Sequence, residues 1–336
     1  MYRVVRNTYH PVVRHYMDII YSAANRTKTK AENVEYKKRH DKLDRIVCDS
    51  PIIAWYYLMR GYKNLAVWFQ GVLPEESFLS RRSHLRFFLL GVIEKIVLKR
   101  AKCVFLVSEE MRIHYQNKYH VDLSEKAFIM PCFNETHVYP EAFTESIKGQ
   151  TIEFLYVGSL SKWQCFSETV DLFSRIEKRS DKLLLFSIYT QEQEEAKRIL
   201  EEYGVRNYRI DYVDHDDLAN RIKSCRYGFV IREDTVINRV ATPTKFSNYL
   251  SNGIVPVYAE CLSSFHKMAM MHGIGIACQI DDLDDAAERV LRHVEKNTVI
   301  CEYANQCKNV FDNYYNTERY VKQISEFLEK ITWRKR

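Results

Sequence analysis

Short apolar runs alternate with longer helical patterns along the whole chain, and this alternation constrains the fold more than any other feature of the sequence. Such runs are typical of buried strands, and the stretches between them are long enough to cross over a sheet. The pattern therefore predicts parallel sheets with crossover helices. Strands are expected at 1–5, 45–48, 65–69, 103–107 and 127–130, and again at 152–157, 183–188, 208–212, 227–231, 254–258 and 275–278.

Helices are expected between these strands, near 11–24, 51–60, 84–100, 108–119, 163–178, 191–203, 215–224, 243–252 and 281–296. The polar stretch 135–150 interrupts the alternation and contains Pro140, so it is the expected domain boundary. We expect a Rossmann-like domain over 1–140 and a second one over 150–300. The remaining residues, 301–336, are expected to form helices that pack back toward the first domain.

Composition narrows the class of protein. The chain has 336 residues, 46% of them hydrophobic, which suffices for two cores. A net charge of +6 fits an anionic ligand or an anionic membrane surface, and does not favour nucleic acid. Nine cysteines occur singly, without a Cys-x-x-Cys pair, which indicates reduced thiols rather than zinc or redox chemistry. No signal peptide or membrane-spanning run is found, so we expect a cytoplasmic protein, with peripheral membrane association left open.

The segment Arg81–Arg100 has two interpretations. It is rich in arginine and lysine, which favours a helix on a membrane surface. However, Leu89, Val92, Ile93, Ile96 and Val97 share one helical face, and the basic residues form two groups rather than an opposite stripe. This geometry favours a core helix with basic flanks.

The segment Thr242–Val257 contains the expected start of a helix, a basic side chain and a following strand. Thr242 can cap the helix, Pro243 suits its first position, and Gly253 can end it. Together with Thr244, this start would offer backbone amides to an anion, and Lys245 would add a full charge. The alternative is an ordinary capped helix with a solvated lysine. Because the chain has no glycine-rich phosphate loop, any phosphate must be held by helix ends and basic side chains.

Ligands of open α/β sheets bind at the carboxyl ends of the strands, so residues just after each strand are candidates. After 152–157, the pair Gly158 and Ser159 would let a ligand approach the backbone, and Lys162 follows close by. Arg232, after 227–231, could reach the same ligand. The alternative for Gly158 and Ser159 is a common turn without a ligand, and the alternative for Arg232 is an arginine on the protein surface.

A metal site is a further alternative, because Asp214-His215-Asp216 matches a pattern that binds divalent metal in some nucleotide-sugar enzymes. Asp214 also stands where a helix should begin, which favours a cap over a metal ligand. The adjacent Tyr212 and Val213 are expected to contact a base through their backbone. The sequence has no Gly-x-Ser-x-Gly elbow and no His-Glu-x-x-His site, which excludes the commonest serine hydrolases and metalloproteases.

Five segments in order resemble family 4 retaining glycosyltransferases of the GT-B fold, especially bacterial members that build surface polysaccharides. They are Trp68–Pro74, Val107–Met111, Ile129–Asn134, Tyr156–Leu160 and Pro243–Leu250, and the last is the most specific. The resemblance covers nearly the whole chain from about residue 45. It implies two Rossmann-like domains with parallel sheets facing a central cleft.

The resemblance also implies how such a chain would act. The donor, a nucleotide-diphosphate sugar, would be held mainly by the C-terminal domain, without a bound metal or other cofactor. The turn at Gly158 would lie at the diphosphate, with Lys162, Arg232 and Lys245 stabilising the leaving group. The sugar would keep its anomeric configuration, because the acceptor hydroxyl attacks from the leaving-group side and gives its proton to the departing phosphate.

The chain departs from the family pattern at several positions. The family's Glu-x7-Glu pair is replaced by Val240 and Asn248, and Asn238 lies close enough in sequence to assist. On the acceptor side, the family's His-Gly is Gln70-Gly71, and Gln70 cannot act as a base. His10, in the loop after the first strand, is then the acceptor-side candidate.

Three functions follow from these residues. The first is a retaining glycosyltransferase that uses a nucleotide sugar and a glycan or lipid-linked acceptor in surface polysaccharide synthesis. The second is a non-catalytic relative that serves as a partner subunit, which the missing glutamates favour. The third is a nucleotide-sugar epimerase of the same fold, which would need a carboxylate or histidine pair that the sequence does not offer.

Overall fold

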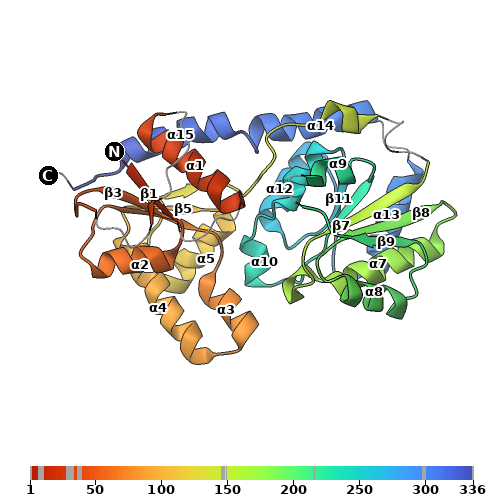
Figure 1. The fold of residues 1–336 in the computed structure, drawn as a ribbon, viewed down its shortest axis with the longest axis horizontal. Helices are drawn as coiled ribbons and strands as arrows, with labels where there is room; N and C mark the ends of the chain where they lie inside the picture. Colours follow the sequence, from red (N-terminus) through yellow and green to blue (C-terminus); the bar gives the residue numbers. More distant parts are fainter. Residues whose placement is uncertain are drawn as a thin grey trace. The chain divides into compact units, whose positions relative to one another are not determined.

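The computed structural model describes residues 2–6, 11–27, 34–35, 40–144, 148, 150–214, 217–296 and 300–334. The chain divides into two compact units, coloured along the sequence in Figure 1. Unit 1 comprises Met1–Asn134, Arg239–Thr242 and Asn316–Arg336, and unit 2 comprises Glu135–Asn238 and Pro243–Tyr315. The change at Asn134 falls immediately before the polar stretch expected to separate two domains. Of the two C-terminal helices, the one that ends before Tyr315 belongs to unit 2 and the last one belongs to unit 1.

Unit 1 holds a six-stranded sheet in the order β2-β1-β3-β4-β5-β6, with every adjacent pair parallel. Its strands are β1 (Tyr2–Arg6), β2 (Val34–Glu35), β3 (Arg45–Cys48), β4 (Leu65–Phe69), β5 (Cys103–Leu106) and β6 (Ala127–Ile129). Its helices are α1 (Pro11–Asn25), α2 (Pro51–Met59), α3 (Leu73–Arg81), α4 (His84–Arg100), α5 (Glu109–Tyr119) and α15 (Thr317–Lys330).

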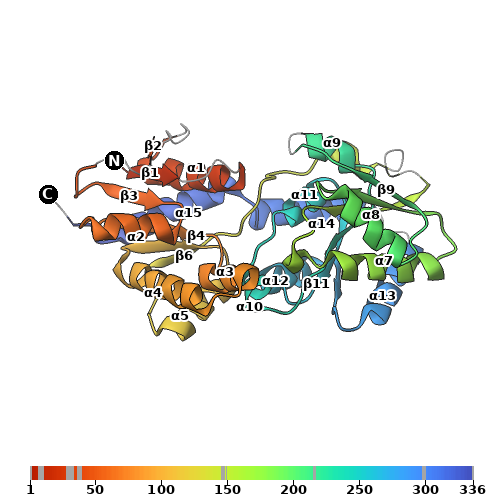
Figure 2. The same cartoon turned by 60° about the horizontal axis from the view of Figure 1, so that its bottom comes forward.

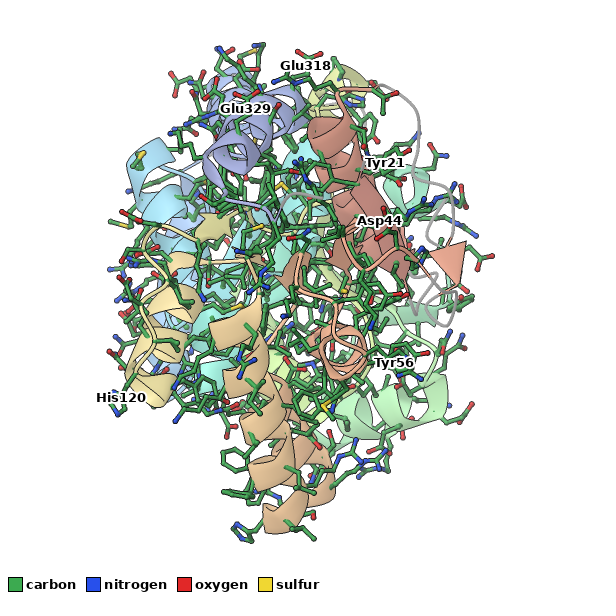
Figure 3. The ribbon with its side chains drawn as sticks, turned by 90° about the vertical axis from the view of Figure 1, so that its left-hand side faces the viewer. Tyr21, Asp44, Tyr56, His120, Glu318 and Glu329 are labelled. Carbon is green, nitrogen blue, oxygen red and sulfur yellow. The ribbon has the colours of Figure 1, made fainter. Side chains whose placement is uncertain are left out.

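The core of unit 1 forms because β3, β4 and β5 are apolar and lie between helices (Figure 2). The stacked rings of Tyr16 and Trp68 join α1 to β4. On α15, the ring of Phe327 contacts Phe105 and Phe128 of the sheet. Figure 3 shows α15, which carries Glu318 and Glu329, beside α1, which carries Tyr21. The C-terminal helix therefore completes the core of unit 1.

Helix α4 buries only part of the face that the sequence predicted, since Val97 of that face is buried and Ile93 and Ile96 are half-buried. It buries Leu90, Val97 and Leu98 together with Glu94, whereas Leu89 and Val92 are exposed. The prediction that Leu89 and Val92 face the core was therefore wrong. The reason is that α4 is apolar on both sides, so periodicity alone could not tell which side is buried. The side that packs on α2 and α3 also provides the carboxylate of Glu94 to two tyrosine hydroxyls.

Unit 2 holds a second parallel sheet, in the order β12-β11-β10-β7-β8-β9. Its strands are β7 (Ile152–Val157), β8 (Leu184–Tyr189), β9 (Tyr208–Asp211), β10 (Tyr227–Val230), β11 (Val255–Ala259) and β12 (Ile276–Cys278). Its helices are α7 (Phe166–Arg179), α8 (Gln193–Glu202), α9 (Leu218–Ile222), α10 (Val236–Val240), α11 (Lys245–Ser251), α12 (Ser263–His272), α13 (Leu283–Glu295) and α14 (Ile300–Asn313), with short 3-10 turns η1 (Pro140–Phe143) and η2 (Lys162–Gln164). Helix α10 continues into the segment assigned to unit 1.

The sheet of unit 2 follows the strand order of a dinucleotide-binding Rossmann domain, because β7 and β10 are neighbours and the chain runs outward from them in both directions. The order of connection reverses between these two strands. Ligands of such sheets bind outside the carboxyl ends of the strands at this switch point. The residues after β7 and β10 therefore stand where a ligand is expected.

The predicted fold class, two α/β units with parallel sheets, is confirmed. None of the nine cysteines forms a disulfide, and most of them are buried. Across the part of the chain that the structure describes, no helix combines the length and the apolar character needed to cross a membrane.

Candidate functional site

Two cationic side chains meet at the switch point of unit 2. Arg232 follows β10, is only 4% exposed, and donates from Nη1 to the backbone oxygens of Ile231 at 2.8 Å and Gln164 at 3.0 Å. Its Nη2 donates to Oε1 of Gln164, and Nζ of Lys245 donates to the same oxygen at 2.7 Å. One neutral amide oxygen is thus shared by a guanidinium and an ammonium group.

The two cations have no carboxylate within ion-pair distance among the described residues. Burial and the neighbouring charge of Arg232 lower the pKa of Lys245 well below its ordinary value, and burial lowers the pKa of Arg232. Buried charges in proteins are normally paired, so two unpaired cations at one point leave the site short of negative charge. The arrangement favours an anion there.

Gly158 gives such an anion access to the cations. It follows β7 with φ of +136°, a backbone conformation that residues other than glycine rarely adopt. Its amide donates to the backbone oxygen of Tyr189 at 3.0 Å. A Cβ at this position would lie 3.0 Å from Nζ of Lys245. The ring of Tyr156 lies below that ammonium group, with its centroid 4.8 Å from Nζ. The turn thus keeps the backbone beside Lys245 free of side-chain atoms.

Helix α11 carries Lys245 to this position because it packs closely on the sheet. Tyr249 lies against Gly228 of β10, where a Cβ would come within 2.5 Å of the tyrosine ring. Asn248, one turn after Lys245, is buried, and its Oδ1 has no hydrogen-bond partner. Since buried polar atoms are normally satisfied, Asn248 has an unused hydrogen-bonding group on the same helix as the lysine.

A pocket of about 300 Å³ adjoins Gly158. It lies across the carboxyl ends of β7, β8 and β9 and is lined by Val157, Gly158, Ser159, Tyr189, Thr190, Gln191, Glu192, Tyr212, Val213 and Leu218. Tyr212 is 45% exposed, and its hydroxyl donates to Asp214 at 3.1 Å. Glu192 accepts from the hydroxyl of Thr190 at 2.8 Å. The pocket therefore combines apolar walls, an exposed ring and one carboxylate.

The structure brings together Gly158, Ser159, Tyr212 and Val213 in this pocket, and Arg232 with Lys245 beside it. Lys162 is exposed, and it lies in the short turn η2 that also carries Gln164. Asn238 is buried on α10, where its Nδ2 donates to the backbone oxygen of Glu233 at 3.0 Å. It braces the loop that follows Arg232.

The expected helix cap at Thr242 was wrong. Helix α11 begins at Lys245, with Thr244 before it in a helical conformation and no side-chain cap. Thr242 instead accepts from the amide of Cys132 at 2.9 Å, within unit 1, because Arg239–Thr242 packs there. Pro243 therefore precedes the helix rather than opening it. Gly253, with φ of +64°, lies just beyond the helix end as predicted.

The acceptor-side residues lie in unit 1. Gln70 follows β4, is exposed, and donates from Nε2 to the backbone oxygen of Asp49 at 2.9 Å. Gly71 accepts from the hydroxyl of Tyr115 at 2.8 Å, and any Cβ there would overlap the carboxylate of Glu76. His10 lies outside the described residues.

The aspartates weighed as a metal site are only partly described. His215 and Asp216 lie outside the described residues, and the helix that follows, α9, is preceded by Asp217 rather than Asp214. In the described part of the chain, no group of three or more histidine, cysteine, aspartate or glutamate side chains is arranged to hold a metal ion.

Sequence reasoning missed the residues that organise the site. Gln164 joins the two cations, Tyr156 lies under the lysine, and Glu192 enters the pocket. Glu192 could have been found, since it stands just after the strand predicted at 183–188. Gln164 could not, because it gains its role only when η2 turns it toward the end of β10.

Comparisons with known proteins agree with this architecture. No family model and no curated protein matches the sequence. Solved structures do match. A variant of TarM from S. aureus, in complex with fondaparinux, alpha-GlcNAc-glycerol and UDP, is 11% identical with a TM-score of 0.62, over 85% of this chain and 55% of that one. The chain thus spans about half the length of that protein.

Two further structures show the same likeness. Sucrose-phosphate synthase from Thermosynechococcus elongatus is 14% identical with a TM-score of 0.63, over 85% of this chain and 73% of that one. A trehalose-6-phosphate protein from E. coli, bound with UDP-2-fluoro glucose, is 11% identical with a TM-score of 0.63. The match covers 88% of this chain and 75% of that one. The fold of this chain is therefore the GT-B fold of glycosyltransferases, as the sequence motifs predicted.

Proposed function

We propose that this protein is a glycosyltransferase that moves a sugar from a nucleotide-diphosphate donor to a glycan or lipid-linked acceptor in surface polysaccharide synthesis. The observation that carries the proposal is the meeting of Arg232 and Lys245 on Gln164, without a carboxylate, at the switch point of a Rossmann-like sheet. A diphosphate supplies the negative charge that this point lacks. The GT-B neighbours, two of which were solved with UDP or a UDP-sugar, support the same choice of ligand.

The two cations would act on the leaving group. In the transfer, the bond between the anomeric carbon and the diphosphate oxygen breaks, and a bond to the acceptor oxygen forms. The nucleoside diphosphate leaves with the electron pair and takes the proton of the acceptor hydroxyl. Phosphate oxygens would replace the Gln164 amide oxygen between Arg232 and Lys245, and these charges would stabilise the departing oxygen without a metal or other cofactor.

The pocket beside Gly158 would hold the nucleoside. Its volume of about 300 Å³ is at the lower end of the range for small-molecule sites. Tyr212 and Val213 would lie along the base, and the Glu192 carboxylate can accept hydrogen bonds from ribose hydroxyls. Asn248, with its unpartnered Oδ1, is the group on α11 that would meet the sugar or ribose.

We further propose that the sugar keeps its anomeric configuration. The described site offers Asn248 rather than a carboxylate on α11, so attack by the acceptor from the leaving-group side needs no covalent intermediate on that helix. On the acceptor side, Gln70 can orient a hydroxyl by hydrogen bonding but cannot remove its proton. The departing phosphate is then the base. A lipid-linked acceptor would bring the enzyme to a membrane surface.

The test measures nucleoside diphosphate release from UDP-, GDP- and ADP-sugars, with and without extracted glycan acceptors, in the presence of EDTA. We expect release with one nucleotide, lost in Arg232→Gln and unchanged in the surface control Lys178→Met. Binding without release would indicate a non-catalytic subunit. Conversion of the sugar without release would indicate an epimerase.

A further inference from the structure

The solvent side of helix α4 is apolar. Leu85, Phe88, Leu89 and Val92 are 70%, 66%, 52% and 39% exposed. At about 100° per residue, these four side chains fall within an arc of about 100°, so they form one continuous stripe. A helix on the surface of a globular protein usually turns such a stripe toward the core. Here the core side is formed by other residues, including Leu90 and Val97.

Basic residues frame this stripe. Arg86 and Lys95 flank it on opposite sides, and Lys99 and Arg100 continue it toward the end of the helix; all four are exposed. No acidic residue occurs between Ser77 and Ile93. The carboxylates nearest in sequence, Glu76 and Glu94, are engaged elsewhere, since Glu76 accepts from the amide of Val72 at 3.2 Å and Glu94 is buried against tyrosine hydroxyls.

The stripe is held in a fixed orientation by a braced hairpin of α3 and α4, which stands out from the rest of unit 1 (Figure 1 and Figure 3). Arg82 turns the chain with φ of +51°, and the hydroxyl of Ser83 accepts from the amide of Arg86 at the start of α4. The ring of Phe78 contacts those of His84 and Phe87. The exposed residues therefore sit on a preformed surface.

We propose that this face of α4 docks on an anionic lipid surface. Its apolar side chains would enter the boundary between head groups and acyl chains, while the flanking arginine and lysine side chains reach the head-group phosphates. The charge distinguishes this partner from a second copy of the chain, because two such faces would place their basic rims against each other. The inference does not depend on sugar transfer.

The experiment is co-sedimentation of the full chain with vesicles of phosphatidylcholine alone or mixed with phosphatidylglycerol. We expect binding to the anionic vesicles only, weakened by high salt, because exposed charges are screened within about 10 Å at 0.1 M. Leu85→Ser with Phe88→Ser should lower the partition coefficient at least about tenfold. Arg86→Gln with Lys95→Gln should weaken binding to the anionic vesicles and remove much of its salt dependence.

The matched control replaces two equally exposed apolar residues elsewhere, Met270→Ser with Met271→Ser, which are 68% and 80% exposed on α12. This control should bind like the wild type, and circular dichroism should show all variants folded. The proposal is overturned if the wild type does not sediment with anionic vesicles, or if the Leu85 and Phe88 variant sediments equally well. A wild-type dimer that this variant makes monomeric, with vesicle binding unchanged, would assign the face to self-association instead.

Discussion

Replacing Lys245 by methionine should stabilise the protein while weakening its donor site. The ammonium group and Arg232 bind the same oxygen of Gln164, so the two donating nitrogen atoms lie within about 5 Å of each other, where an effective dielectric constant of 20 gives a repulsion of about 3 kcal/mol. The lowered pKa of Lys245 relieves part of this. Lys245→Met removes the repulsion and loses one hydrogen bond, worth about 1 kcal/mol. The net gain should be about 1–2 kcal/mol.

Thermal unfolding measures this gain. For a unit of this size, 1 kcal/mol corresponds to about 2–4 °C, so Tm should rise by about 2–8 °C. Because burial lowers the pKa of Lys245, the unfolded chain binds more protons than the native one between that lowered pKa and about 10.4. Wild-type stability should therefore rise with pH through that window, and the variant should lose this slope.

Donor affinity should change in the opposite direction. Loss of a charge-assisted hydrogen bond costs about 1.5–3 kcal/mol, so the Kd for the nucleoside diphosphate should rise about 10- to 150-fold. Lys178→Met, which removes an exposed lysine from α7, should change neither property. A variant with lowered Tm and wild-type affinity would refute the reasoning, since Lys245 would then be a structural residue.

Three further predictions concern other positions. Gly158→Ala should lower the free energy of unfolding by about 1–3 kcal/mol because of its φ of +136°, and unchanged stability in a denaturant titration would contradict this. The same change should weaken nucleotide binding, measured by calorimetry, because the added Cβ meets Nζ of Lys245. Asn248→Ala should leave Tm nearly unchanged, since Oδ1 has no partner to lose, but should lower affinity for the sugar nucleotide; equal affinity would remove Asn248 from the site. Burial raises the pKa of Glu94 to about 7, so the native protein holds a proton that the unfolded chain releases above about pH 4.5. The free energy of unfolding should therefore fall as pH rises from about 4.5 to 7. Urea titrations at several pH values should show a smaller pH dependence for Glu94→Gln.

The alternation of apolar runs and helices was enough to predict both sheets. Each of the eleven expected strands corresponds to a strand of the structure, including the weaker candidate at the N-terminus, which is β1. The clearest signals come from strands such as β4 and β10, which are buried along their whole length and therefore read as continuous apolar runs. The short strand β2 at Val34–Glu35 was not expected, since two residues in a charged segment carry no periodic signal. Leu89 and Val92 of α4 were wrongly predicted to face the core, whereas Val97 was correctly predicted, because α4 is apolar on both sides and periodicity alone could not tell which side is buried.

The candidate site was predicted in part. Residues that follow strands, such as Gly158 and Arg232, could be placed because topology alone brings the carboxyl ends of parallel strands together. The role of Gln164 could not, since it depends on the side-chain geometry of η2. Thr242 was misplaced because its hydroxyl is used by the amide of Cys132, which lies far away in sequence.

Isothermal titration of the metal-free chain with UDP, GDP and ADP in EDTA tests the central claim most directly. The claim is that Arg232 and Lys245 hold a diphosphate without a metal. It predicts that one nucleotide binds and that Arg232→Gln, which keeps a hydrogen-bond donor but loses the charge, weakens binding at least about tenfold. Binding that needs added divalent metal, or that is equally tight in Arg232→Gln, would contradict the account.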